Sequence, residues 1–290
     1  TMFEKLQQAS RLNDNGSFPY LRSHPMTTER ISDAQARQQL LPKRGAVPTL
    51  PMHAMMSARA QVLTNPGIDV LRTIAMQANT NTLMTAHKAK QAGILYGATL
   101  AEMKQRNFAE ARQHLTRLQA LGGFDANAQR VVRLLAAELA LASGDASQAV
   151  VLLESKATVM AANDRATRIQ LAQSRVATRK AAQGKLAASD LLLWLSQHPR
   201  DATAWLIQAS AYELQGDGLR AIRAQAEARA MELDYGAAVD RFKAAQMLAH
   251  QMAGEGKLDR AGHMEASIID ARLRELERLR REQALERGIN

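Results

Sequence analysis

The strongest structural signal in this chain lies in residues 202–221, which read ATAWLIQASAYELQGDGLRA. Large and small apolar residues are three and four positions apart, an interval that places them on one face of a helix. A glycine followed by a short polar break is typical of a helix end. The stretch therefore predicts two helices joined by a tight turn. The residues that indicate this pair of helices and its turn are Trp205, Ala209, Tyr212, Gly216 and Ala221.

Similar combinations of a turn and a small residue recur on both sides of this stretch. The small residues follow one another at separations of 38, 40, 32 and 40 residues, close to the period of about 34 residues in tetratricopeptide repeats. The chain therefore resembles a tetratricopeptide-like (TPR-like) helical solenoid of about five helix pairs. The additional signature residues are Ala111, Gly144 with Ala149, Gly184 with Ser189, and Gly256 with Ala261.

The composition favours the same all-α fold. Of the 290 residues, 46% are apolar but only 4% are aromatic, and Pro199 is the single proline after Pro66. A β-sandwich is expected to contain more aromatic and β-branched residues, whereas long helices tolerate few prolines. We expect the solenoid to occupy residues 91–290 and to end in a capping helix near residues 268–287.

A cluster of basic residues marks one candidate binding surface. The chain carries a formal charge of +10, and Arg168, Arg175 and Arg179 are separated by seven and four positions, which predicts one helix face. On the first helix of the third pair, this stripe would line the concave face and select acidic segments of a partner. The alternative is a solvated helix face. Aromatic residues for base stacking are missing from this stretch, so we do not expect nucleic acid as a partner.

The first ninety residues do not repeat. We expect helical segments in residues 1–41 and a proline-rich linker at residues 42–51, where three of ten residues are proline. A helical preface then covers residues 52–90, with helices near 52–63 and 67–90. Proline fixes the backbone and removes a hydrogen-bond donor, so the linker is expected to be extended.

Residues 20–31 read YLRSHPMTTERI. This segment resembles the S-x-H-P-x-x-x-x-R-I motif that follows the catalytic core in bacterial zinc metallopeptidases of family M forty-eight, in particular the subgroup with a C-terminal tetratricopeptide domain. The resemblance implies that residues 1–41 are the end of a peptidase domain and that the parent protein is a periplasmic zinc endopeptidase. It also implies that His24 can approach the zinc of the full-length protein as a regulatory ligand.

The resemblance further implies the partners of the chain. These are outer-membrane proteins that are unfolded or being assembled, their assembly machinery, and the peptidase domain of the same polypeptide. The repeats would hold such partners for assembly and quality control.

The motifs that would make this chain itself an enzyme are missing from its sequence. The HExxH zinc motif of the family does not occur in it, nor do GxSxG, GxGxxG or a P-loop, and there is no cysteine. We therefore expect no catalytic residue, metal or cofactor within this chain, and no transmembrane segment. The alternative hypotheses are a free-standing TPR adaptor without a protease domain and, more remotely, a helical repeat that binds RNA or DNA.

Overall fold

The computed structural model describes residues 32–33, 36–37, 50–64, 66–154 and 164–288. The chain divides into two units, Thr1–Pro48 and Thr49–Asn290, and the helices named below belong to the second unit. The described residues are helical with short connections and contain no strand, which confirms the predicted all-α class. The predicted peptidase remnant, 1–41, lies almost wholly outside the described residues.

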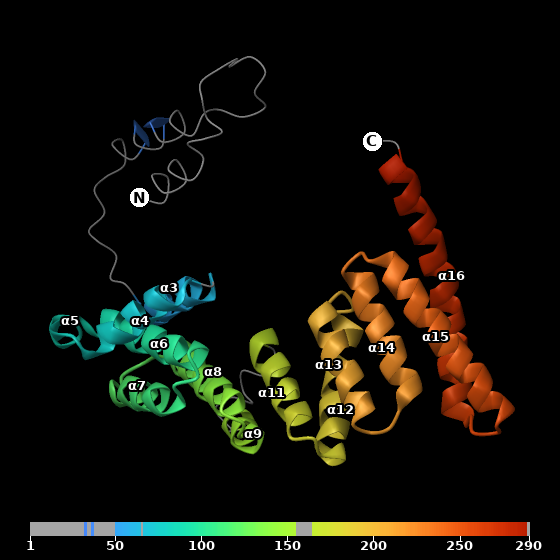
Figure 1. Ribbon diagram of the computed structural model, residues 1–290, viewed down its shortest axis with the longest axis horizontal. Helices are drawn as coiled ribbons and strands as arrows, with labels where there is room; N and C mark the ends of the chain where they lie inside the picture. The colour runs from blue at the N-terminus through green and yellow to red at the C-terminus, as the bar shows by residue number, and fades with distance from the viewer. Residues whose placement is uncertain (1–31, 34–35, 38–49, 65, 155–163, 289–290) are drawn as a thin grey trace. The chain divides into compact units, whose positions relative to one another are not determined.

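Five helix pairs make up most of the described part of the second unit (Figure 1). In each pair a short turn joins two helices that contact each other, and each pair contacts the next. The pairs are α6 (Lys88–Lys104) with α7 (Phe108–Ala120), α8 (Ala126–Ala142) with α9 (Ala146–Glu154), α11 (Arg165–Ala177) with α12 (Ala181–Gln197), α13 (Ala202–Glu213) with α14 (Gly218–Met231), and α15 (Tyr235–Gly254) with α16 (Arg260–Gly288).

Short helices precede these pairs: α3 (Pro51–Leu63), α4 (Ile68–Met76), the 3₁₀ turn η2 (Gln77–Asn79) and α5 (Asn81–Thr85). The predicted helix near 52–63 is present as α3. It starts at Pro51, which we had assigned to the linker, because proline fits the first turn of a helix. The predicted continuous helix 67–90 is wrong. The backbone is extended at Thr80 (φ −96°, ψ 161°), where the threonine hydroxyl donates to the Gln77 carbonyl (2.9 Å) and competes with the helical pattern.

Aspartate side chains cap most of the helix starts. Each carboxylate accepts a hydrogen bond from the backbone N–H three residues later, which satisfies a donor that has no partner inside the helix. The negative charge also complements the positive end of the helix dipole. The capping residues are Asp125, Asp145, Asp164, Asp201, Asp217, Asp234 and Asp259.

The described helices α6, α8, α13, α14 and α15 end in a common turn. One residue adopts a positive φ, and the next donates its N–H to the carbonyl five residues earlier, as in a Schellman motif. Gly144, Gly216 and Gly256, the predicted turn glycines, adopt the positive φ in three of these turns. Arg106 (φ 63°) and Leu233 (φ 61°) adopt it in two others, although side chains with a Cβ are strained there.

The small signature residues lie at contacts between helices, with two corrections. Ala111, Ala149 and Ala221 are buried and come four residues after Asn107, Asp145 and Asp217 at the starts of α7, α9 and α14. In the fourth unit, the turn residue Gly216 is exposed, and Trp205 is half-buried and donates from Nε1 to the Pro199 carbonyl (2.9 Å). The buried members are Ala209 and Tyr212.

Gly184 is not a turn residue, as we had predicted, but lies inside α12. It stands four residues after the N-cap Lys180, so it is the third-unit equivalent of the buried alanines, and Ser189 is not. A Cβ at Gly184 would lie 3.0 Å from the Cβ of Leu214, so any larger residue would push the two helices apart. Ala261 is also misassigned, because α16 begins at Arg260 and this alanine is exposed in its first turn.

The apolar core is divided among neighbouring helices. One cluster joins α3, α6, α7 and α8 through large side chains such as Met55, Tyr96 and Leu135. A second joins α11 to α14, and a third joins α14, α15 and α16 around Phe242 and Ile269. Each cluster is made by elements adjacent in the chain, so the packing is local, as in repeat proteins.

Candidate functional site

The predicted arginine stripe is not formed. Arg168 and Arg175 lie on α11, but this helix ends at Ala177, and Arg179 lies in the following turn with φ 56°. The three residues therefore do not share one helix face. The sequence around the turn, Thr178-Arg179-Lys180, contains no glycine or proline that would predict the helix end.

Arg175 and Arg168 take part in packing within the molecule. Arg175 is only 8% exposed. Its guanidinium forms ion pairs with Glu154 (Nη2 to Oε1, 3.0 Å) and with Asp190, so it joins α9, α11 and α12. The guanidinium carbon of Arg168 lies 5.5 Å from the centroid of the Trp194 ring, a cation–π distance. A free basic surface on α11 is therefore not supported by these two residues.

A groove lies instead along the first helices of the early pairs. It has a volume of about 380 Å³ and is lined by side chains from α3, α6, α8 and α11. We call it the first-helix groove. Its apolar lining residues are Met56, Val131, Leu134, Leu141, Ala166 and Ile169, and its polar ones are Arg59, Tyr96, Arg130, Glu138, Asp164, Gln170 and Gln173.

Two arginine–carboxylate pairs contribute the charges of this groove. Arg59 on α3 donates to both carboxylate oxygens of Glu138 on α8 (2.7 and 3.3 Å) and to the hydroxyl of Tyr96 (3.2 Å). Arg130 on α8 pairs with Asp164, the N-cap of α11. The charges balance within each pair, so the groove combines apolar surface with fixed polar groups that have no net charge.

The protonation states in this groove follow from burial and pairing. Burial raises the pKa of the Tyr96 hydroxyl, and the positive charge of Arg59 only partly opposes this, so Tyr96 is neutral at pH 7. Burial would lower the pKa of Arg59, but the hydrogen bond and charge of Glu138 outweigh it, and the pKa is raised. Such a surface suits noncovalent binding of side chains rather than proton transfer near neutral pH.

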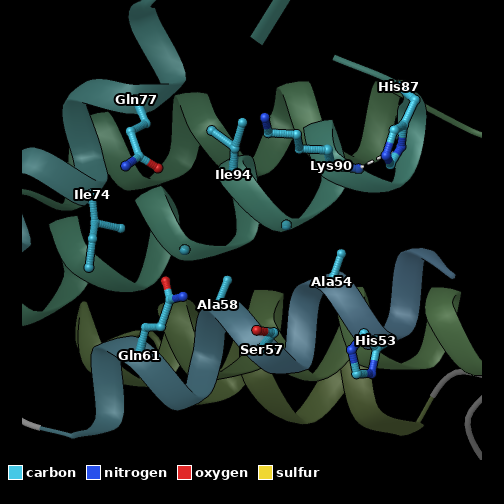
Figure 2. A pocket seen from close by; sticks show the side chains of 12 residues that line it. His53, Ala54, Ser57, Ala58, Gln61, Ile74, Gln77, His87, Lys90 and Ile94 are labelled. Atoms are coloured by element: carbon cyan, nitrogen blue, oxygen red, sulfur yellow. Dashed lines mark hydrogen bonds between the residues drawn. The ribbon is translucent and has the colours of Figure 1, made fainter. Parts of the chain in front are cut away.

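A second groove of about 370 Å³ lies between α3 and α6, next to α4 and η2 (Figure 2). We call it the α3–α6 groove. Its floor is made where the two helices approach closely. A Cβ at Gly93 would lie 3.0 Å from the carbonyl oxygen of Ala54, and one at Gly97 would lie 3.2 Å from the Cβ of Ala58.

Polar side chains line the walls of the α3–α6 groove. Figure 2 shows His53 on α3 and His87 on the opposite wall at one end, and Gln61 and Gln77 towards the other end. His87 caps α6 by accepting the Lys90 N–H at Nδ1 (3.3 Å). This role places the proton of the neutral ring on Nε2, which can therefore donate. Lys90 adds a positive charge, and none of the described lining residues is a carboxylate.

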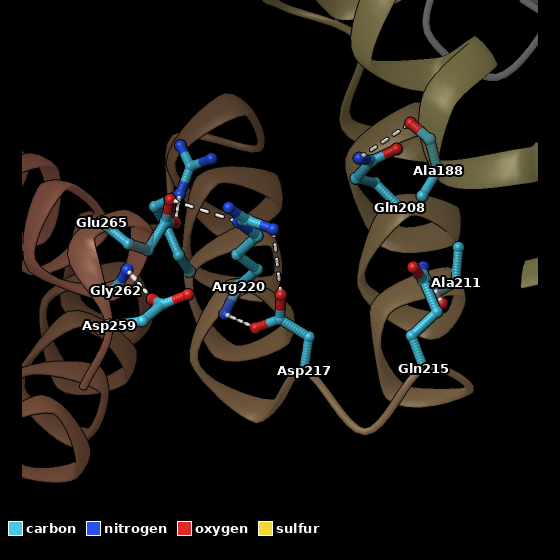
Figure 3. Close-up of polar contacts among 10 residues, drawn as sticks. Ala188, Gln208, Ala211, Gln215, Asp217, Arg220, Asp259, Gly262 and Glu265 are labelled. Atoms are coloured by element: carbon cyan, nitrogen blue, oxygen red, sulfur yellow. Dashed lines mark hydrogen bonds and ion pairs between the residues drawn. The ribbon is translucent and has the colours of Figure 1, made fainter. Parts of the chain in front are cut away.

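A third polar group joins α14 to α16 and is structural (Figure 3). Glu265 is only 6% exposed and forms ion pairs with Arg223 and with Arg220 (Nε to Oε2, 3.7 Å). Arg220 also reaches Asp217, the N-cap of its own helix (3.2 Å). Since all these charges are paired within the protein, the group fixes the position of α16.

Among the described residues there is no group of three or more histidine, cysteine, aspartate or glutamate side chains that could hold a metal ion. His24, the proposed regulatory ligand, lies outside the described residues. Within the described ranges, no helix is both long and apolar enough to cross a membrane.

Comparison with known proteins gives no family assignment. No model of a known protein family matches this chain, and neither does any curated protein.

The α3–α6 groove and the first-helix groove were both missed by the sequence analysis. The small-residue pairs Gly93/Gly97 and Ala54/Ala58, each spaced by four, were a visible signal for close helix packing. The pairing of Arg59 with Glu138 had no such signal, because 79 residues separate them.

Proposed function

We propose that this chain is a TPR-like region that binds segments of other proteins. The first-helix groove is the observation that carries this proposal. Its apolar surface can bury side chains of a partner, while the Arg59–Glu138 and Arg130–Asp164 pairs can form hydrogen bonds with a polypeptide. Contacts between successive first helices (α6 with α8, α8 with α11, and α11 with α13) agree with the stacking expected of such repeats.

We further propose that the chain is the C-terminal part of a periplasmic zinc metallopeptidase of family M forty-eight. The support is the YLRSHPMTTERI segment at residues 20–31, followed by a proline-rich stretch and helix pairs. In this proposal the repeats hold outer-membrane proteins or their assembly machinery near a peptidase domain and raise their local concentration. The alternative function is a free-standing TPR adaptor with no protease domain.

The binding proposal is tested with a urea-unfolded outer-membrane β-barrel protein, diluted into buffer and carrying a fluorescent label. Leu141→Glu places a charge in the first-helix groove, and we expect it to weaken binding about tenfold, as expected when an apolar contact is replaced by a desolvated charge. Leu186→Glu is the matched control, because Leu186 is 48% exposed on α12 outside the groove. Equal affinities for both variants, with unchanged circular dichroism, would contradict the proposal.

The parentage is tested by reading the coding frame upstream of Thr1. An HExxH motif on a predicted helix, followed by a further glutamate, supports the peptidase parent. A frame with neither motif favours the adaptor. The binding experiment above is unaffected by either result.

A further inference from the structure

We propose that the α3–α6 groove binds a short acidic segment of a partner polypeptide. This inference rests on the proposed function as a protein-binding region, and it concerns a different surface from the first-helix groove. The argument uses the charge, the hydrogen-bonding groups and the length of this groove.

The charge of the groove favours an anionic ligand. Lys90 brings a positive charge to the lining, His53 and His87 add ring nitrogens, and the described lining residues include no carboxylate that would neutralise Lys90. The Nε2 of His87 is a donor, because its Nδ1 accepts the Lys90 N–H. This differs from the first-helix groove, where each arginine is already paired. No carboxylate among the described lining residues of the α3–α6 groove accepts hydrogen bonds from these donors. An acidic side chain of a ligand at this end would therefore form charge-assisted hydrogen bonds with them.

The remaining polar groups favour a polypeptide over a free anion. Ser57, Gln61 and Gln77 provide hydroxyl and amide groups. Such groups both donate and accept hydrogen bonds, and a peptide backbone offers the same two kinds of group in alternation. A phosphate or sulfate, by contrast, requires donors only.

The dimensions limit the length of the segment. His53 and Gln61 are eight positions apart on α3, which corresponds to about 12 Å at a rise of about 1.5 Å per residue. An extended chain covers this distance with about four residues. Between the two ends the lining is apolar except for Ser57, and it includes Ile74, Ile94 and the close approach of Ala54 to Gly93. The expected ligand is thus an acidic residue followed or preceded by an aliphatic one.

The test uses a library of peptides with blocked ends and four varied positions, selected on the immobilised intact chain. We expect Asp or Glu to be enriched next to Leu, Ile or Val. The best peptide is then measured by fluorescence polarisation. In the variant carrying His53→Asn and Lys90→Gln, its affinity should fall about tenfold, the effect of losing a charge-assisted hydrogen bond.

A matched control removes the same charge elsewhere on the helix. Lys104→Gln changes an exposed lysine at the far end of α6, and it should leave the affinity unchanged. Selection of peptides without enrichment of Asp or Glu would overturn the inference, and so would an affinity that survives in the double variant. Competition by anionic lipid vesicles or an oligonucleotide as effective as that of the peptide would also overturn it, since the groove would then select charge alone.

The two proposals fail in different ways. If non-acidic peptides are selected and Leu141→Glu abolishes client binding, this inference is wrong and the proposed function stands. If no peptide is selected and Leu141→Glu has no effect on client binding, both are wrong.

Discussion

The two ends of the described helix pairs are held together by different interactions. From α3 to α8, large apolar side chains such as Met55, Tyr96 and Leu135 form the core, and two helices touch through glycine and alanine. From α14 to α16 an apolar core surrounds Phe242 and Ile269, and ion pairs with carboxylates only 6–7% exposed also join the helices.

The two regions also differ in where their charged side chains lie. In the first region, polar side chains line grooves, and the Arg59–Glu138 pair is about one-third exposed on both sides. In the second region, the carboxylates of Glu227 and Glu265 are buried in ion pairs between α14 and α16. We therefore expect substitutions of charged residues to affect binding at the α3–α8 end and stability at the α14–α16 end.

We expect the largest loss of stability from a substitution at the α14–α16 end. Arg272 donates to both oxygens of Glu227 (2.6 and 2.8 Å), and this contact is the main reason that the pKa of Arg272 is raised. Arg272→Ala leaves a buried carboxylate without a partner, so the free energy of unfolding should fall by about 3 kcal/mol. Arg59→Ala should cost about 1 kcal/mol, since its pair is more exposed. Urea denaturation measures both.

A companion variant separates charge from packing. Replacing Arg272 and Glu227 together by leucine should recover most of the lost stability, because no buried charge remains. If Arg59→Ala is as destabilising as Arg272→Ala, the contrast between the two regions does not hold.

The next effect concerns the small-residue contact between α3 and α6. Gly93→Leu would drive a side chain into the carbonyl of Ala54, 3.0 Å from the position of the new Cβ. We expect a loss of about 2 kcal/mol from overpacking, measured as a lower midpoint of urea denaturation. Gly254→Leu is the control, since no atom lies within 4 Å of the Cβ position there. Equal stability of both variants would show that the close approach is not required.

A pH effect is expected at the α3–α8 end. His114 on α7 is 4% exposed and its Nδ1 has no hydrogen-bond partner. Burial, and then the charge of Arg117, lower its pKa below 6.5, although Glu102 and Glu110 act in the opposite direction. Since the folded state disfavours the protonated ring, its stability contribution is full above the unfolded pKa and is lost as the pH falls below about 6.5.

This prediction is checked by comparing thermal midpoints at about pH 7.5 and about pH 5.5. His114→Gln cannot titrate in this range and should lose less stability on acidification than the original chain. Hydrogen exchange should locate the difference in α7. An identical pH dependence of both proteins would contradict it.

The smallest effect is expected at two turns, one at each end. Arg106 and Leu233 adopt positive φ values, which glycine adopts without strain. Arg106→Gly and Leu233→Gly should each change the free energy of unfolding by about 0.5–1 kcal/mol in the stabilising direction. The reverse change, Gly216→Ala at φ 74°, should destabilise by about 1 kcal/mol. If calorimetry finds that Leu233→Gly is less stable than the original chain, the packing of the leucine side chain contributes more to stability than the backbone strain costs.

The sequence predicted the helical class and the approximate places of the pairs, because the spacing of small apolar residues is a local property. It failed where a position depends on distant residues. Arg175 is buried by Glu154 and Asp190, which are 21 and 15 positions away, so its charge appeared available. Gly184 was misread because glycine serves both turns and close helix contacts.

The aspartate caps were a missed local signal, because they recur at the starts of helices. The third unit lacks this signal at the start of α12, where Lys180 stands at the N-cap and no side chain caps the helix. Two of them also have partners in the preceding pair: Arg130 reaches Asp164, 34 positions on, and Arg165 reaches Asp201, 36 positions on.

This sharing of caps has a consequence for how such a chain can change in length. A deletion of residues 164–200 would remove one whole unit and bring Asp201 to the place of Asp164, where Arg130 can still pair with it. A deletion of only part of the stretch between Arg165 and Asp201 would instead change the spacing of that pair. Within this stretch, insertions and losses are therefore expected to be tolerated best in whole units, so the number of units is a quantity that can vary among related chains.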